Sequence, residues 1–332
     1  MGLKTHGLVT GIVMQLDTIH VPVMLERTLD LLAPALTGRA RPVLVDATLG
    51  MGGHTRAALE RFPDLTVIGI DRDSDALAIA QERLAPFADR VRFVHAVYDQ
   101  LAELVADFGK DAVTGILFDL GVSSLQLDRA ERGFSYSRDA PLDMRMDASC
   151  GATAADILAS ASEEDLRRVF AEYGEERLAG RYARAIVQTR VERPFTRSSE
   201  LVATIQSVTP VNVQRQGHPA KRVFQALRIA VNEELRVLER AIPEALELVA
   251  TGGRIVVLSY HSLEDRIVKR AFNRATTSSA PADLPIELPE HQPEFVSIVR
   301  GAELVSDAEE ATNSRARPVR LRAVERVRRE IS

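Results

Sequence analysis

Two short apolar segments, each ending in an aspartate, enclose a glycine-rich turn. The first segment ends at Asp46 and the second, some residues later, ends at Asp71; between them lies Gly50-Met51-Gly52-Gly53-His54. A strand, a glycine turn and a helix in this order let a ligand approach bare backbone, and an acid about 20 residues further on can bind a ribose hydroxyl pair. The pattern predicts a pocket for a nucleoside cofactor at the edge of a parallel sheet.

The glycine spacing distinguishes between classes of nucleoside cofactor. A dinucleotide fingerprint has glycine at three places; here Gly50 and Gly52 occupy the first two, whereas Thr55 occupies the third. The turn is therefore a poor cradle for a pyrophosphate and suits a cofactor without phosphate, such as S-adenosylmethionine. Asp71 would bind its ribose, and Asp46 would favour its cationic end. The alternative is an ordinary strand-to-helix turn in which Asp71 caps a helix.

Strand and helix signals alternate through the first part of the chain. The expected strands are residues 43–47, 66–70, 91–95 and 115–119, and the expected helices between them are residues 53–61, 73–84 and 98–108. Short connections in such an alternation imply right-handed crossovers and a doubly wound parallel sheet of the α/β class. Strand signals return only at residues 254–259, 294–300 and 319–324.

A helical segment interrupts this sheet. Residues 124–222 carry amphipathic helical patterns at 163–173, 178–190 and 198–208 and almost no strand signal. A long helix follows over residues 223–250, with a kink or interruption expected at Pro243. We therefore predict a discontinuous catalytic domain around an all-helical inserted domain. The expected bounds are 1–18 for a disordered extension, 19–123 and 223–332 for the catalytic domain, and 124–222 for the insertion.

Composition excludes several classes of protein. The net charge of -5 means that any nucleic-acid surface has to come from local clusters of arginine. The single cysteine, Cys150, excludes an internal disulfide and a cysteine-based zinc site, and the histidines lack a spacing typical of metal ligands. The sequence contains no apolar run near the roughly 18 residues that span a bilayer. We expect a cytoplasmic protein with neither a metal nor a membrane partner.

Three further candidates follow predicted strands at the edge where open α/β sheets bind ligands. Tyr98 follows the third strand and is placed to stack on an adenine. Asp119 ends the fourth strand and is a candidate for contact with both cofactor and methyl acceptor. His261 follows the fifth strand, and it is a candidate acid or base because histidine as a residue type can exchange a proton near neutral pH. Simple packing is the alternative for Tyr98, and an ordinary exposed or hydrogen-bonded histidine is the alternative for His261.

Several longer motifs resemble one known family. They are His20-Val21-Pro22-Val23, Asp46-Ala47-Thr48-Leu49-Gly50-Met51-Gly52-Gly53-His54, Ile70-Asp71-Arg72-Asp73, Asp119-Leu120-Gly121-Val122-Ser123-Ser124, Arg132-Gly133-Phe134-Ser135, Pro141-Leu142-Asp143-Met144-Arg145-Met146-Asp147, Tyr173-Gly174-Glu175-Glu176-Arg177, Phe224-Gln225-Ala226-Leu227-Arg228 and His261-Ser262-Leu263-Glu264-Asp265-Arg266. With them the chain resembles the bacterial 16S ribosomal RNA cytosine-N4 methyltransferase family over residues 19–325. The Pro-Leu-Asp-Met-Arg-Met-Asp and His-Ser-Leu-Glu-Asp-Arg runs are the most specific.

The resemblance implies a class I Rossmann-like methyltransferase sheet with a late antiparallel strand and a helical insertion. It implies S-adenosylmethionine as cofactor, a decoding-centre cytidine of 16S ribosomal RNA as substrate, and the exocyclic N4 as methyl acceptor. The cofactor residues that it implies are Gly52, Gly53, His54, Asp71, Tyr98, Asp119 and Gln126. Family members often have Phe where Tyr98 stands. Pro318 departs from the family's usual ending, which leaves the start of the last strand open.

The substrate partner would be 16S ribosomal RNA, within the small ribosomal subunit. Phe134 and Tyr136 open the insertion and are candidates to stack on a flipped base, with core packing as the alternative. Arginines in three clusters are candidates for phosphate contacts, although helices with Arg and Glu are often only solvated faces. The clusters are Arg167, Arg168, Arg177, Arg181, Arg184, Arg190, Arg193 and Arg197 in the insertion, a second basic cluster of His218, Lys221, Arg222 and Arg228, and Arg315, Arg317, Arg320, Arg322, Arg326, Arg328 and Arg329 at the C-terminus. Of these, Arg181 and Arg184, together with His261, are the substrate-binding candidates.

The chemistry also leaves alternatives open. A conjugated amino group is a weak nucleophile, and we expect Asp119 or a neighbouring loop carbonyl to accept its hydrogens while positioning supplies most of the rate. The alternatives are an amino-methyltransferase acting on DNA or a small molecule, a nicotinamide-dependent oxidoreductase, which the missing third glycine disfavours, and a non-catalytic RNA-binding assembly factor.

Overall fold

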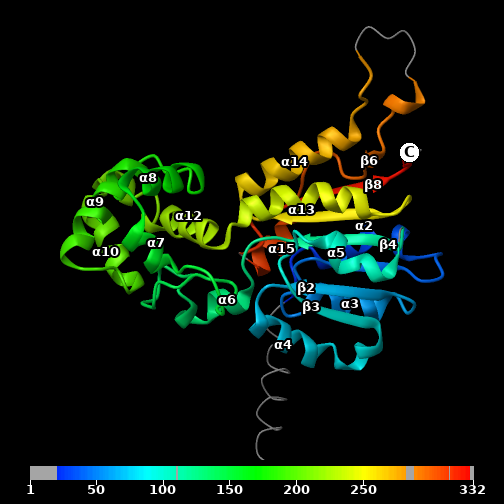
Figure 1. Ribbon diagram of the computed structural model, residues 1–332, viewed down its shortest axis with the longest axis horizontal. Helices are drawn as coiled ribbons and strands as arrows, with labels where there is room; N and C mark the ends of the chain where they lie inside the picture. Colours follow the sequence, from blue (N-terminus) through cyan, green and yellow to red (C-terminus); the bar gives the residue numbers. More distant parts are fainter. Residues whose placement is uncertain (1–20, 110, 282–287, 314, 330–332) are drawn as a thin grey trace, which may run out of the picture. The chain divides into compact units, whose positions relative to one another are not determined.

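The computed structural model describes residues 21–109, 111–281, 288–313 and 315–329 (Figure 1). The chain divides into two compact units, unit 1 with Met1–Gly121 and Val237–Ser332 and unit 2 with Val122–Arg236. The expected extension over residues 1–18 lies outside the described residues. Within the described residues, the helices are all too short or too polar to cross a membrane.

Unit 1 is built on an eight-stranded sheet with the order β3-β2-β1-β4-β5-β8-β6 and β7 paired to β8. Its strands are β1 (Val43–Asp46), β2 (Thr66–Asp71), β3 (Val91–His95), β4 (Val113–Asp119), β5 (Arg254–Ser259), β6 (Phe295–Ser297), β7 (Glu303–Leu304) and β8 (Arg320–Arg326). The first five strands pair in parallel, whereas β8 is antiparallel to β5. The predicted doubly wound α/β sheet with a late antiparallel strand is confirmed.

Alternation of side chains along each strand separates two cores, one on each face of this sheet. Leu44 and Val67 pack on one face with residues of α2 and α3, while Val45 and Ile68 pack on the other with residues of α13 and α14. The helices of unit 1 are α2 (Leu25–Leu36), α3 (Gly53–Arg61), α4 (Ser74–Arg83), α5 (Leu101–Val105), α13 (Glu234–Leu248), α14 (Ser262–Thr276) and α15 (Asp307–Thr312), with 3-10 turns η1 (Ala85–Arg90), η2 (Ala106–Phe108) and η4 (Pro289–His291). A strand that is buried on both faces has a continuous apolar run in its sequence, and the strands of this sheet are predicted from such runs.

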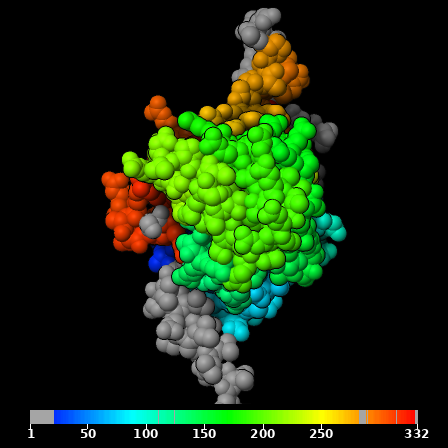
Figure 2. Space-filling view, turned by 90° about the vertical axis from the view of Figure 1, so that its left-hand side faces the viewer, coloured from blue at the N-terminus to red at the C-terminus, as the bar shows by residue number. Residues whose placement is uncertain are grey.

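Unit 2 is helical around a single core, and Figure 2 looks onto its surface, coloured in greens. Its helices are α6 (Ser124–Asp128), α7 (Ala154–Ser160), α8 (Glu163–Glu172), α9 (Ala179–Glu192), α10 (Ser198–Val208), α11 (Val211–Gln214) and α12 (Ala220–Asn232), with the 3-10 turn η3 (Ala130–Arg132). Phe170, Tyr182 and Leu227 are fully buried at the centre, from α8, α9 and α12 respectively.

The predicted helix over residues 223–250 is wrong in one respect, because it is two helices. The break lies at Glu233, whose φ of 51° is left-handed, and Pro243 lies inside α13 without ending it. The buried pair Arg228–Glu234, with Nε and Oε1 2.8 Å apart, joins the two sides of the break.

The predicted insertion bounds need a related correction. Unit 2 extends from Val122 to Arg236, beyond the expected end at residue 222. The reason is that α12 contributes Val223, Phe224 and Leu227 to the unit 2 core, so it belongs with the helices it packs against. Hydrophobic periodicity alone shows that α12 has a buried face but not which core covers it.

Candidate functional site

The glycine turn after β1 presents open backbone. Gly50 has a φ of +54°, and a Cβ there would meet only the Thr48 carbonyl oxygen at 3.9 Å. Its N–H donates to Asp71 Oδ2 at 2.7 Å, which joins the turn to the end of β2. The predicted glycine turn and its distant acid are therefore in direct contact. Gly50 is the glycine at which a ligand can reach the chain without displacing a side chain.

Gly52 and Gly53 are required for packing. A Cβ on Gly52 would lie 2.9 Å from Leu84 Cδ1, and one on Gly53 would lie 2.5 Å from Pro22 Cγ. Gly52 is also the N-cap residue of α3, which is not capped by a side chain. The first N–H groups of α3 are thus left for another acceptor, as helix N-termini commonly offer them.

The two acids at the ends of β1 and β2 have different tasks. Asp46 is buried and accepts a hydrogen bond from the Thr55 hydroxyl at 2.6 Å, so it connects the end of β1 to α3 across the turn. Asp71 accepts the N–H groups of Gly50 and Asp73. Burial raises the pKa of each carboxyl to about 6. The capping role considered for Asp71 belongs to Asp73, which accepts the N–H of Asp75 at 3.1 Å and begins α4.

Asp119 lies at the carboxyl end of β4 among three polar partners. Its N–H donates to Thr48 Oγ1 at 2.6 Å, and its Oδ1 accepts the Tyr260 hydroxyl at 2.8 Å. Its Oδ2 lies 3.6 Å from His54 Nδ1. Burial raises the pKa of Asp119 to about 7, against the hydrogen bond from Tyr260, which lowers it. A carboxyl group of this kind exchanges a proton near neutral pH.

The His54 ring is held in one tautomer. Its Nε2 lies 3.2 Å from the Val23 carbonyl oxygen, which can only accept, so Nε2 carries the hydrogen. Nδ1 therefore presents a lone pair to Asp119. Burial lowers the pKa of His54, which keeps the ring neutral. The 3.6 Å between Nδ1 and Asp119 Oδ2 is longer than a hydrogen bond, so the ring lies beside the carboxyl group without being bonded to it.

Tyr98 and His261 lie in unit 1 with different surroundings. The Tyr98 ring is half-buried and meets Phe118 edge to face, with centroids 5.6 Å apart. His261 is the N-cap of α14, where its ring and the Glu264 side chain form a capping box; its Nε2 lies 3.2 Å from Glu264 Oε1. The cap uses Nδ1 of His261, whereas its Nε2 is buried and has no hydrogen-bond partner within the described part of the chain.

The remaining candidates belong to unit 2. Gln126 is buried and forms a capping box with Ser123 at the start of α6. Phe134 is buried in the unit 2 core, which favours the packing alternative for its ring. Tyr136 is half-buried and stacks on His218 with centroids 4.6 Å apart. Arg181 and Arg184 are exposed on α9, where they line one cavity together with Gln188.

Sequence reasoning missed Tyr260 and Thr48 as neighbours of the site. Tyr260 is 141 residues from Asp119 in the chain, and the two meet because β4 and β5 are adjacent parallel strands. The signal that was available is that Tyr260 follows the fifth strand directly, at the same edge as Asp119. A Cβ on Gly121 would also contact the Tyr260 ring at 3.4 Å, so that ring lies against the loop after β4.

One edge of this doubly wound sheet carries an open glycine turn, an acid placed to bind ribose hydroxyls and a carboxyl group whose pKa is raised. Together these features define an enzyme that uses a nucleoside cofactor. The MraW methylase family matches residues 17–327 of this chain. The chain belongs to that family and is a methyltransferase.

Its relatives have nearly the same length. A protein of Leifsonia xyli subsp. xyli is 63% identical and covers 93% of this chain and 95% of its own. One of Clavibacter michiganensis subsp. michiganensis is 62% identical, with 95% and 99% covered, and one of Saccharopolyspora erythraea is 60% identical, with 93% and 94% covered. Each is named ribosomal RNA small subunit methyltransferase H.

Proposed function

We propose that this methyltransferase moves the methyl group of S-adenosylmethionine to the exocyclic N4 of a decoding-centre cytidine in 16S ribosomal RNA. The observation that carries the proposal is Asp119, a carboxyl group at the carboxyl end of β4 with Tyr260 and His54 on its two oxygens. Membership of a methylase family and relatives named for small-subunit ribosomal RNA support it. Such a substrate, within the small subunit, places the enzyme in the cytoplasm.

The residues of unit 1 fit this cofactor. Gly50 offers bare backbone, the uncapped start of α3 offers N–H groups, and the Asp71 oxygens retain lone pairs for ribose hydroxyls after accepting one N–H each. Tyr98, held edge to face by Phe118, offers an aromatic surface. When bound, S-adenosylmethionine supplies an electrophilic methyl group. The predicted cofactor residues Gly52, Gly53, His54, Asp71, Tyr98, Asp119 and Gln126 remain the proposed set.

The acceptor chemistry falls to Asp119. An Asp119 oxygen that accepts a hydrogen bond from the N4 amino group draws the nitrogen lone pair out of conjugation and makes it more nucleophilic. As the new N–C bond forms, the C–S electron pair leaves with sulfur, and the amino nitrogen loses one proton to the carboxylate. His54 Nδ1, 3.6 Å from Oδ2, offers a lone pair beside the protonated carboxyl group.

For RNA contact we favour the exposed face of α9. Arg181, Arg184 and Gln188 are exposed there, at a spacing that places them on one side of the helix. Arg181 donates to the Val208 carbonyl oxygen at 3.2 Å and Arg184 lies 3.4 Å from Glu163, whereas Arg190 is half-buried and donates to the Leu158 and Ala161 carbonyl oxygens at 2.7 Å each. The inserted helical unit is thus the proposed substrate-recognition part.

Deleting the gene and mapping cytidine methylation in the host's ribosomal RNA by mass spectrometry tests the function. We expect one N4-methylated cytidine to be lost from 16S ribosomal RNA. It should return with the wild-type gene and not with Asp119→Asn. An unchanged methylation pattern after deletion would favour the alternative, an amino-methyltransferase for DNA or a small molecule.

A further inference from the structure

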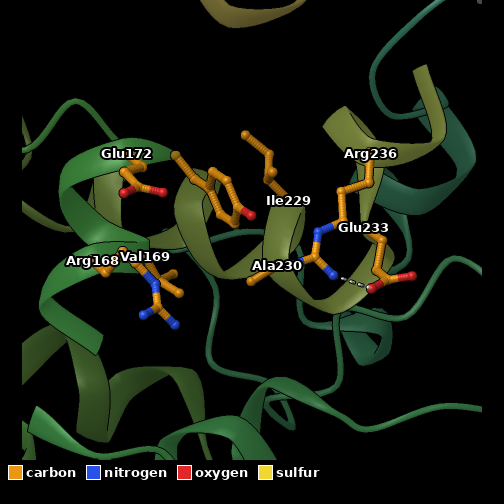
Figure 3. A pocket seen from close by; sticks show the side chains of 8 residues that line it. Arg168, Val169, Glu172, Ile229, Ala230, Glu233 and Arg236 are labelled. Atoms are coloured by element: carbon orange, nitrogen blue, oxygen red, sulfur yellow. Dashed lines mark hydrogen bonds and ion pairs between the residues drawn. The ribbon is translucent and has the colours of Figure 1, made fainter. Parts of the chain in front are cut away.

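A second cavity lies within unit 2, between α8 and α12, and none of the proposed cofactor residues lines it. It has a volume of about 280 Å³. Figure 3 shows Arg168 and Glu172 on one wall, Glu233 and Arg236 on the other, and Ala230 between them. Val169, Tyr173 and Ile229 complete the lining.

The turn that carries Tyr173 is fixed firmly to α12. A Cβ on Gly174 would lie 2.7 Å from the Arg222 carbonyl oxygen, so only glycine fits against that helix. Gln225 donates to the Tyr173 carbonyl oxygen at 3.2 Å, and Arg222 donates to that of Glu175 at 2.7 Å. Two motifs of the family resemblance, residues 173–177 and 224–228, therefore meet here. Their backbone contacts leave the Tyr173 ring available to line the cavity.

Backbone strain also occurs beside this cavity. Glu175, next to the turn, has a φ of 47°, and Glu233, in the cavity wall, has a φ of 51°. Left-handed backbone at residues other than glycine is uncommon and tends to gather at functional sites. The wall that contains Glu233 is thus held in a conformation that ordinary helix continuation would not produce.

The chemistry of the lining suits one nucleotide. The guanidinium groups of Arg168 and Arg236 are exposed. Among the described residues, each pairs with an acid three positions earlier in the chain, Arg168 with Asp165 at 2.7 Å and Arg236 with Glu233 at 3.2 Å. Exposed pairs of this type contribute little to stability, so a phosphate can replace them. Val169, Ile229 and the Tyr173 ring offer a surface for a base, and Glu172 can accept from exocyclic amino groups. Among the described residues, the Tyr173 hydroxyl has no hydrogen-bond partner.

We propose that this cavity binds a nucleotide of the RNA substrate other than the target cytidine. The inference rests on the proposed function and adds a second anchoring point to it. The cavity volume lies just below the roughly 300–1,000 Å³ of sites for drug-sized ligands, as expected for a single base with its phosphate outside.

The test uses the full chain and purified small ribosomal subunits that lack the methyl group. The variants are the double substitution Arg168→Gln with Arg236→Gln, the single substitution Tyr173→Leu, and the control Arg215→Gln, an exposed arginine outside the cavity. The readouts are KM for subunits, kcat, S-adenosylmethionine affinity, thermal melting, and the salt dependence of subunit binding.

We expect the double variant to raise KM roughly tenfold and to flatten the salt slope by about 0.7, since the contact with one phosphate is lost. Tyr173→Leu should raise KM about tenfold through lost stacking without changing the salt slope. Melting, kcat and cofactor affinity should match the control. A double variant whose KM and salt slope equal those of Arg215→Gln, or one that loses kcat alone, overturns the pocket while the methyltransferase function stands. Wild-type protein that binds cofactor but neither binds nor methylates subunits contradicts both.

Discussion

Asp119 has two properties that a proton acceptor in methyl transfer needs. It lies at the ligand-binding edge of the sheet, and burial raises its pKa to about 7. The carboxylate is the form that accepts a proton, so its population increases as pH rises through that value. The other ionisable groups that act on this cluster are Asp46, His54, Tyr260, Glu264 and Glu309.

Replacing Asp119 by Asn tests this role. We expect kcat to fall by about 100-fold or more, because an amide cannot take the proton. Wild-type kcat should rise with pH through about 7, whereas the residual activity of Asp119→Asn should be flat across that range. An unchanged melting temperature is the control for folding, and kcat is measured at saturating cofactor because Asp119 also belongs to the proposed cofactor residues. Full turnover in Asp119→Asn would remove the proposed role.

Tyr260 is predicted to adjust Asp119 without contacting the substrate. Its hydroxyl donates to Asp119 at 2.8 Å and lowers the pKa of that carboxyl group. Tyr260→Phe should therefore keep part of the activity and move the midpoint of the pH–rate profile above that of the wild type. A profile with an unchanged midpoint would show that the hydroxyl does not act on Asp119.

The residues at the site divide into those that sequence alone could identify and those that it could not. The glycine turn, Asp71 and Asp119 were identified because each lies next to a strand end in an alternating pattern. Tyr260 and Thr48 were missed because their contacts depend on which strands become neighbours in the sheet. His54 was identified only by resemblance, because the contact with the Val23 carbonyl oxygen that sets its tautomer forms only in the folded chain.

At the scale of elements, α3 depends on glycine at its first residue. A Cβ on Gly53 would approach Pro22 Cγ to 2.5 Å, so Gly53→Ala should destabilise the protein by about 1–3 kcal/mol. Gly180 is the matched control, because it lies inside α9 and its Cβ would meet only the Arg167 side chain, at 3.7 Å or beyond. Gly180→Ala should stabilise by about 0.5–1 kcal/mol. Denaturant unfolding of both variants measures the difference, and equal effects would contradict the packing explanation.

The break between α12 and α13 is stabilised by Asn232. Its side chain donates to the Met144 carbonyl oxygen at 2.8 Å and accepts the Met146 N–H at 2.7 Å, so it connects α12 to the Pro-Leu-Asp-Met-Arg-Met-Asp segment. That motif therefore contributes to the folded structure of unit 2 through its backbone.

Asn232→Ala would leave these two buried backbone groups without partners. We expect it to lower the free energy of unfolding by about 2–4 kcal/mol. Asn273→Ala, on the exposed side of α14, should change it by less than about 0.5 kcal/mol. Thermal melting compares the two, and an Asn232→Ala protein as stable as Asn273→Ala would exclude this role.

Most helices and strands were predicted closely because their apolar period is uninterrupted. The helix α2 was not predicted, although Leu29, Leu32 and Leu36 form its buried stripe, and Pro34 lies inside it. The break at Glu233 was placed at Pro243 instead. Proline is a visible signal, whereas a left-handed glutamate is stabilised by contacts that only the folded chain provides.

At the scale of the whole molecule, a protein of net charge -5 that acts on RNA needs its cations concentrated locally. Many arginines of the chain are engaged internally, such as Arg322 with Asp265 and Arg326 with the Val249 carbonyl oxygen. The C-terminal cluster considered for RNA contact thus contributes largely to the sheet. The exposed arginines of α8 and α9 remain the better candidates for phosphate contact.

Incubating the purified protein with S-adenosylmethionine and unmethylated small subunits, then digesting the RNA and analysing its nucleosides by mass spectrometry, tests the methyl transfer most directly. We expect close to one N4-methylcytidine per 16S ribosomal RNA, a rate about 100-fold or more lower with Asp119→Asn, and no product on duplex DNA or free cytidine. A protein that binds the cofactor yet leaves every cytidine of the subunit unmethylated, or that methylates DNA equally well, would contradict the proposal.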